Sequence, residues 1–139
     1  MSLYKKFSTD QDKEKKGIWI GIATTDDDKE VGFIVARAGG YNTRFMKVMR
    51  EVYKPVSAQV QAGTLSPKKD RNLTIQVFVK ACLLGWENVT DKEDKPLEFN
   101  FANAVQLFED LPELFNKIFQ LAQDAENYKN VALEEDLGN

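Results

Sequence analysis

The chain has 139 residues, of which 42% are apolar, and a formal net charge of −3. This length and composition are typical of one folded domain with a real hydrophobic core. The absence of His excludes the usual Ser-His-Asp and Cys-His catalysis and His-ligated zinc. The single cysteine, Cys82, excludes an internal disulfide and a multi-cysteine zinc site.

No segment has the pattern of a membrane anchor or a leader. The apolar runs are well below the roughly 20 residues that a membrane-spanning helix needs, and Lys80 interrupts the richest of them. The amino terminus lacks the charged start and apolar run of a signal peptide. We therefore expect a soluble intracellular protein.

Charge is distributed unevenly along the chain. Residues 1–36 hold six Lys and seven acidic residues, a net charge of −1. Residues 37–80 hold nine basic and two acidic residues (+7), and residues 81–139 hold four basic and thirteen acidic ones (−9). Such asymmetry is typical of contacts with nucleic acid, with a partner or between copies, and it is equally compatible with a solvated surface that has no role.

The first elements that the sequence predicts are a charged arm and a β-hairpin. Residues 1–16 are mostly charged, and we expect them to form a flexible arm. Two β-rich stretches follow, GIWIGIATT and EVGFIVARA, and the turn-forming TDDDKE between them predicts an antiparallel hairpin. Trp19, Phe33 and Val35 are the candidates for its buried face, and a one-residue error in the pairing would reverse that choice.

A helix is predicted from Asn42 or Thr43 to about Gln61. Pro55 should kink or split it, because proline removes a backbone donor, and Gly63 should end it. Its apolar residues recur at spacings of four, three and four, which places them on one face. These are Phe45, Met49, Val52 and Val56, and the other faces carry Arg44, Lys47, Arg50 and Lys54.

A central helix should follow this first one. Ser66 with Pro67 is typical of a helix start, because the hydroxyl caps the helix and proline suits its first position. The segment from Leu73 to Leu84 is apolar on most sides, which indicates a buried helix, and Gly85 is its predicted stop.

The carboxyl-terminal part predicts two more helices and a tail. Asn100 should cap the first helix, and a capping box of Asp110 and Glu113, with Pro112 in the first helical position, should begin the second. The fold class is therefore α+β, mainly helical, with a small amino-terminal antiparallel β-hairpin packed on about four helices. The expected organisation is a flexible charged arm (1–16), a single α+β domain (17–130) and an acidic tail (131–139).

Several clusters could carry chemistry, but each has a simpler structural interpretation. Asp26 to Asp28 lack the spacing of a calcium loop and are expected to form a polar turn. Gly39-Gly40 belongs to no phosphate-binding motif and is expected to end the hairpin. Glu109, beside the capping pair Asp110 and Glu113, could suggest paired carboxylates, and helix capping explains that pair better.

The remaining candidates are a thiol and a basic group. Cys82, flanked by apolar residues, is expected to be a small buried hydrophobe. Lys68, Lys69 and Arg71 could meet phosphates, but Asp70 lies among them and interleaved aromatic residues are missing. We therefore predict no catalytic residues, no metal site, no cofactor and no nucleic-acid partner.

A series of short segments spans most of the chain. In the carboxyl-terminal half, residues 83–89 end a helix with a Trp, residues 95–99 give a Pro-apolar-aromatic step, and a helix then leads to DLP and a last helix. In the amino-terminal half the segments are FSTDQDKEKKGIWI, ARAGGYNTRF and the YKP of residues 53–55. In this order they resemble the tail assembly chaperones of long-tailed bacteriophages, over roughly residues 5–130.

The resemblance implies a function without catalysis. In that family, copies bind the tape-measure protein, prevent its aggregation and help recruit tail-tube subunits during tail assembly. It implies that the partners are the tape-measure and tail-tube proteins of the same phage, with no membrane. The expected location is the host cell cytoplasm during phage assembly and not the mature virion. The alternatives are a small nucleic-acid-binding regulatory protein and, further off, a small intracellular enzyme.

Two surfaces are singled out by the sequence. In GWENVTDKEDKPLEFN, Trp86, Leu97 and Phe99 are expected to form a structural joint around a solvated charged turn, with a loop-centred binding surface as the alternative. The candidate partner-binding residues are of opposite charge, which is compatible with head-to-tail self-association. The rival interpretation is a monomer whose acidic end folds back over its own basic helix. The candidate residues are Arg44, Lys47, Arg50, Lys54, Asp124 and Glu126, with Glu134, Glu135 and Asp136 in the tail.

Overall fold

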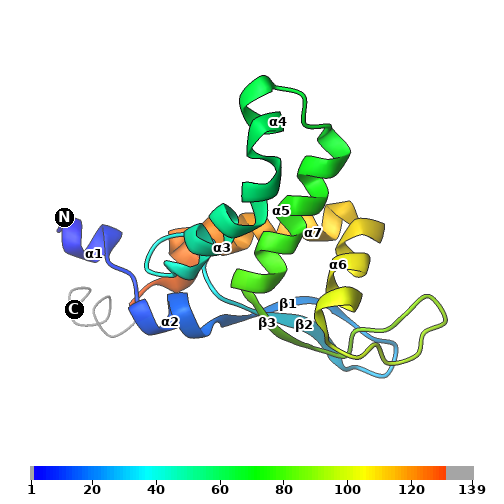
Figure 1. Cartoon of the computed structure of the whole chain (residues 1–139). Coiled ribbons are helices and arrows are strands. Elements are labelled where there is room, and N and C mark those ends of the chain that lie inside the picture. The colour runs from blue at the N-terminus through cyan, green and yellow to red at the C-terminus, as the bar shows by residue number, and fades with distance from the viewer. Residues whose placement is uncertain (1, 131–139) are drawn as a thin grey trace.

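The computed structural model describes residues 2–130, and they form two layers. One layer is a three-stranded antiparallel sheet, and the longer helices lie above it as the second layer (Figure 1). The predicted class, mainly helical α+β with a hairpin near the amino terminus, is confirmed. The elements are α1 (Leu3–Phe7), α2 (Gln11–Lys16), β1 (Ile18–Thr24), β2 (Glu30–Val35), α3 (Arg44–Tyr53), η1 (Lys54–Val56), α4 (Ser57–Ala62), α5 (Pro67–Ala81), β3 (Leu83–Glu87), α6 (Phe101–Asp110), α7 (Pro112–Gln123) and η2 (Ala125–Tyr128).

The predicted hairpin is present, but its buried face on β1 is the opposite one. Ile20 pairs with Phe33 and is buried, whereas Trp19 pairs with Ile34 and is 41% exposed. The prediction for Phe33 is correct and that for Trp19 is wrong, because successive side chains of a strand point to opposite faces. Trp19 instead lies over Gly32 on the open face of the sheet, so closely that a Cβ at Gly32 would collide with the indole ring.

The central helix is shorter than predicted, because its last residues form a strand. Helix α5 ends at Ala81, and β3 pairs antiparallel with β2, which becomes the middle strand of the sheet. Gly85 is therefore a strand residue opposite Ile34 and not a helix stop. The open backbone edge of β2 supplies hydrogen bonds that a helix continuing from Ala81 would leave unmade.

Proline and glycine act as predicted in the helical region after the sheet. Pro55 lies in the short 3-10 turn η1, which separates α3 from α4. Gly63 ends α4 in the left-handed conformation, with φ of +69°. Ser66 caps α5 by accepting a hydrogen bond from the Lys69 N–H at 3.1 Å, and Pro67 is the first helical residue.

The last two long helices begin differently from each other. Asn100 caps α6, as predicted, by accepting from the Asn103 N–H at 2.8 Å. The predicted capping box at Asp110 is wrong, because α6 continues through Asp110 and α7 begins at Pro112 without a side-chain cap. Asp110 accepts a hydrogen bond from the Gln106 side chain instead.

Part of the segment expected to be a flexible arm is folded against the domain. Asp10 caps α2, and its backbone N–H donates to the carbonyl of Tyr128 at 2.8 Å. Glu14 on α2 is fully buried and forms an ion pair with Arg37, which follows β2. Burial of a carboxylate beside its cation fixes this helix, so the structured part of the chain extends to the amino-terminal side of residue 17.

The core between the two layers is rich in phenylalanine. Phe33 of the sheet contacts Phe108 of α6 with ring centroids 6.1 Å apart, and Phe78 of α5 contacts both Phe108 and Phe115. All four rings are at most 5% exposed.

In the part of the chain that the structure describes, no helix is long and apolar enough to cross a membrane.

Candidate functional site: an apolar groove with a basic rim

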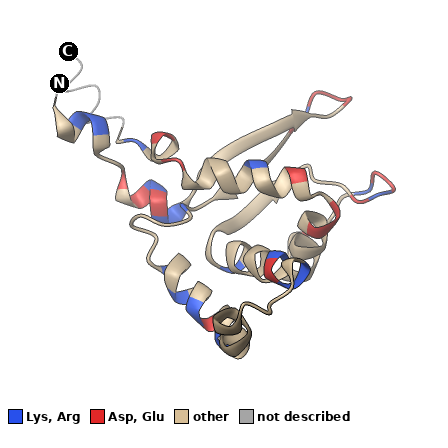
Figure 2. Ribbon diagram, turned by 90° about the horizontal axis from the view of Figure 1, so that it is seen from above, with Lys and Arg blue, Asp and Glu red and all other residues tan. Residues whose placement is uncertain are grey.

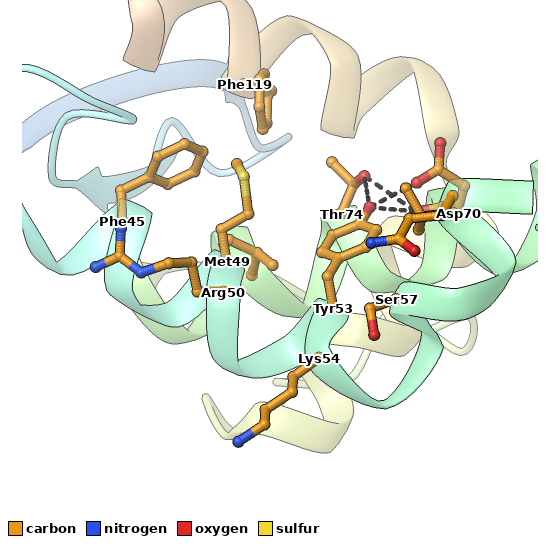
Figure 3. A pocket seen from close by; sticks show the side chains of 12 residues that line it. Phe45, Met49, Arg50, Tyr53, Lys54, Ser57, Asp70, Thr74 and Phe119 are labelled. Atoms are coloured by element: carbon orange, nitrogen blue, oxygen red, sulfur yellow. Dashed lines mark hydrogen bonds between the residues drawn. The ribbon is translucent and has the colours of Figure 1, made fainter.

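An open groove of about 620 Å³ lies between α3, α4 and α5. Pro55 turns the chain between α3 and α4, and Gly63 returns it toward α5. Helices α4 and α5 therefore form opposite walls of the groove (Figure 1). Figure 3 shows Phe45, Met49 and Phe119 facing one another, whereas the Lys54 side chain extends outward. The lining residues are Phe45, Met49, Arg50, Tyr53, Lys54, Ser57, Val60, Gln61, Asp70, Thr74, Val77 and Phe119.

The floor of the groove is apolar and packs on the core. Phe45 of α3 is buried and meets Phe119 of α7 with ring centroids 6.4 Å apart at 64°. Phe119 is in turn 5.6 Å from Phe78 of the core. The groove floor is therefore continuous with the hydrophobic core, whereas Val60 at its rim is 50% exposed.

A small polar cluster joins α3 to α5 at the groove. The Tyr53 hydroxyl donates to the Asp70 carboxylate at 2.6 Å and lies 2.9 Å from the Thr74 hydroxyl (Figure 3). Burial, with the hydrogen bond to Asp70, raises the pKa of Tyr53 above its ordinary value. The phenol is thus a neutral donor at physiological pH, and it ties the end of α3 to the beginning of α5.

The rim of the groove is basic. Arg50 and Lys54 are exposed at its edge, and neither takes part in an ion pair within residues 2–130. The acidic residues of the β1–β2 turn and of the loop after β3 lie at two projecting tips, away from α3 and α4 (Figure 2). Within the described residues, the groove therefore has exposed cations without ion-pair partners at its edge.

The sequence-predicted partner residues do not form one surface. Arg50 and Lys54 lie at the groove, whereas the Arg44 guanidinium donates to the carbonyl of Lys80 at 3.1 Å. Lys47 is exposed on α3. Asp124 caps η2, and Glu126 pairs with Lys129 at 3.6 Å, so both make their contacts locally. Glu134, Glu135 and Asp136 lie outside the described residues.

The predicted joint residues lie together. Trp86 stands on β3, edge-on to Phe33 at 6.1 Å and to Phe99 at 5.0 Å. Its indole N–H donates to the carbonyl of Leu97 at 3.0 Å, and Leu97 packs on the core. The charged turn between them is closed by Asp91, whose carboxylate accepts from the backbone N–H of Glu93 and of Lys95.

We expect Trp86→Ala to lower the free energy of unfolding by about 3 kcal/mol, because it removes a half-buried ring and its hydrogen bond. Trp86→Phe should cost about 1 kcal/mol, since it keeps a ring against Phe33 and Phe99. Chemical denaturation measures both. Unchanged stability of Trp86→Ala together with loss of partner binding would assign the ring to an interface.

The other candidate chemical groups have structural surroundings. Cys82 is fully buried, as predicted, and burial raises the pKa of its thiol to about 12. Asp27 accepts a hydrogen bond from the Thr25 hydroxyl at 2.6 Å, which holds the pKa of its carboxyl below the ordinary value. Glu109 accepts from the Asn72 side chain at 2.8 Å. Within residues 2–130, no cluster of three or more acidic or Cys side chains could hold a metal ion.

The raised thiol pKa predicts a falling stability in alkali. Below pH 9 the Cys82 thiol is protonated in both the folded and the unfolded chain, so its contribution to the free energy of unfolding does not change with pH there. Above pH 9 only the unfolded chain loses this proton, and stability should fall by up to about 1.4 kcal/mol per pH unit as the pH approaches 12. Urea unfolding between pH 8 and 10.5 should show a shallower fall for Cys82→Ala; equal slopes would contradict the assignment.

The groove itself was not recognised in the sequence, although its inner face was. Phe45 and Met49 fit the apolar helical pattern, but that pattern does not say that the surface stays open. The usable signal is Val60, the one large apolar side chain on helix α4. Phe119, which closes the floor, comes from a helix distant in sequence and could be assigned only from the structure.

These features define a small α+β protein with an open apolar groove in its basic region. The family model of the YdaY prophage protein matches residues 40–139, which include every residue that lines the groove. The chain therefore belongs to the YdaY prophage protein family and is phage-derived. No curated protein and no solved structure matches it.

Proposed function

We propose that this prophage protein is a tail assembly chaperone, which binds the tape-measure protein and helps to recruit tail-tube subunits. The observation that carries the proposal is the apolar groove with a basic rim whose cations have no ion-pair partner among residues 2–130. An exposed apolar hollow bordered by polar residues is typical of a protein interaction surface. The resemblance to phage tail assembly chaperones over residues 5–130 and the membership of a prophage family agree with it.

The proposed action is protection by binding and needs no catalysis. A long helical tape-measure protein exposes apolar surface until tube subunits cover it, and a groove that covers such surface keeps it soluble. The proposal of a non-enzymatic role also rests on the absence of His and on the buried thiol of Cys82. The corresponding location is the host cytoplasm during assembly, and copies of the chaperone are proposed to leave before the virion is complete.

Co-expression with the tape-measure protein of the same phage tests this function. The soluble yield of the tape-measure protein should rise, and the two should co-purify. Val60→Asp, which places a charge at the groove edge, should abolish the gain without unfolding a chain in which Val60 is already half exposed. No gain with the wild-type chain would contradict the proposal.

The basic segment of residues 37–80 favours one alternative, a nucleic-acid-binding regulator. Such binding would be sequence-tolerant in its phosphate contacts and would weaken steeply with salt. A strongly salt-dependent affinity for DNA or RNA, with no effect on the tape-measure protein, would favour this alternative.

A further inference from the structure

We infer that the groove takes an amphipathic α-helix whose apolar face is bordered by acidic side chains. The proposed function supplies the identity of the partner, the tape-measure protein, and the chemistry of the bound segment is derived from the groove alone. Two properties of the groove carry the inference: the nature of its walls and the sign of its free charges.

The walls select a helix over an extended strand. They are formed by three helices, α3, α4 and α5, and include no sheet edge. A strand binds by adding backbone hydrogen bonds to an open sheet edge, and these walls offer none. What they offer is apolar side-chain surface, chiefly the half-buried Met49 and the exposed Val60, against which the regularly spaced apolar side chains of a helix can pack.

The rim selects acidic residues. Arg50 and Lys54 are one turn apart on the same wall, both exposed and without an ion-pair partner in the described part of the chain. The charged residues that line the groove are Arg50, Lys54 and Asp70, and Asp70 already accepts the Tyr53 hydrogen bond. Complementary charges at an interface rim direct the partner and fix its register. A bound helix should therefore place Glu or Asp beside α3.

The aromatic residues of the groove argue against a nucleic acid as the occupant. Binding of single strands needs ring faces on which bases can stack. The Phe45 ring is buried against Phe119, and the Tyr53 hydroxyl is held by Asp70 and Thr74. Both rings are held in place by these contacts, and neither projects as a platform on which a base could stack.

Two fluorescent helical peptides with the same apolar face test the inference, one flanked by Glu and one by Lys. At low ionic strength, the full chain should bind the Glu peptide about tenfold more tightly than the Lys peptide. The double reversal Arg50→Glu with Lys54→Glu should invert that preference. Lys92→Glu with Lys95→Glu, in the exposed loop after β3, changes the net charge equally and should leave the preference intact. Val60→Asp should weaken both peptides.

Several results would overturn the inference. Equal affinity for the two peptides, or binding insensitive to Val60→Asp, would show that the groove does not select an amphipathic helix bordered by acidic residues. Self-association of the chain that Val60→Asp abolishes in sedimentation would make a second copy the occupant. Displacement of the Glu peptide by an oligonucleotide would indicate that the groove binds a nucleic acid. If the peptides behave as expected while co-expression fails, the groove chemistry holds and the chaperone function does not.

Discussion

Arg37→Ala should lower the free energy of unfolding by about 3–5 kcal/mol, one of the largest effects expected for a single substitution in this chain. Arg37 is the ion-pair partner of Glu14, which is fully buried on α2. The Thr9 hydroxyl, at 3.1 Å from the second carboxylate oxygen, is too weak a donor to replace a guanidinium. The variant therefore leaves an uncompensated carboxylate in the interior.

The contacts around this ion pair show why its loss should destabilise neighbouring elements as well. The backbone N–H of Arg37 donates to the carbonyl of Glu14 at 2.8 Å, so α2 and the end of the sheet are joined twice. Gly40 has φ of +54° and lies so close that a Cβ there would collide with the Glu14 carboxylate. Release of α2 would also expose Tyr128, which is fully buried and donates to the carbonyl of Val35.

Chemical denaturation measures the effect, with two comparisons. Lys29→Ala removes an exposed ion pair with Asp27 at 3.8 Å and should change stability by less than about 0.5 kcal/mol. Replacing both partners, with Glu14→Leu and Arg37→Met, should recover much of the loss, because no charge is then left buried. A loss below about 1 kcal/mol for Arg37→Ala would mean that the pair is solvated in solution.

Local signals in the sequence predicted local structure well. Pro55, Gly63, Ser66 and Asn100 were assigned correctly because each acts through its own backbone or through a cap within three residues. Such features depend little on the rest of the fold. The same holds for the apolar face of α3, whose spacing alone identifies Phe45 as buried.

The failures share a non-local cause. Residues 83–87 continue an apolar helical pattern, yet they form β3 because the edge of β2, some fifty residues earlier, is available for pairing. Trp19 was placed on the wrong face because register is set by the partner strand. The burial of Glu14 depends on Arg37 in the same way. The groove, too, depends on contacts between α3, α5 and α7 that no local pattern encodes.

The groove floor gives the second large effect, because it rests on the core. Phe78 is fully buried, with Phe108, Phe115 and Phe119 at ring-centroid distances of 6.1, 5.6 and 5.6 Å. Phe78→Ala should cost about 3–5 kcal/mol, which combines lost burial with the cavity that the rigid neighbours cannot fill. Phe78→Leu should cost about 1.5 kcal/mol or less, since most of the volume is kept.

A matched surface variant and a binding measurement complete this test. Phe101→Ala truncates a ring that is 40% exposed and rests near the Lys80 ammonium, so it should cost about 1 kcal/mol or less. Because Phe119 lines both the cavity left by Phe78→Ala and the groove, the truncated variant should also bind the Glu-flanked peptide more weakly under conditions in which it is still folded. Equal denaturation midpoints for Phe78→Ala and Phe101→Ala would contradict the packing of this core. Unaltered peptide affinity in a destabilised Phe78→Ala would show that the groove floor keeps its shape without support from α5.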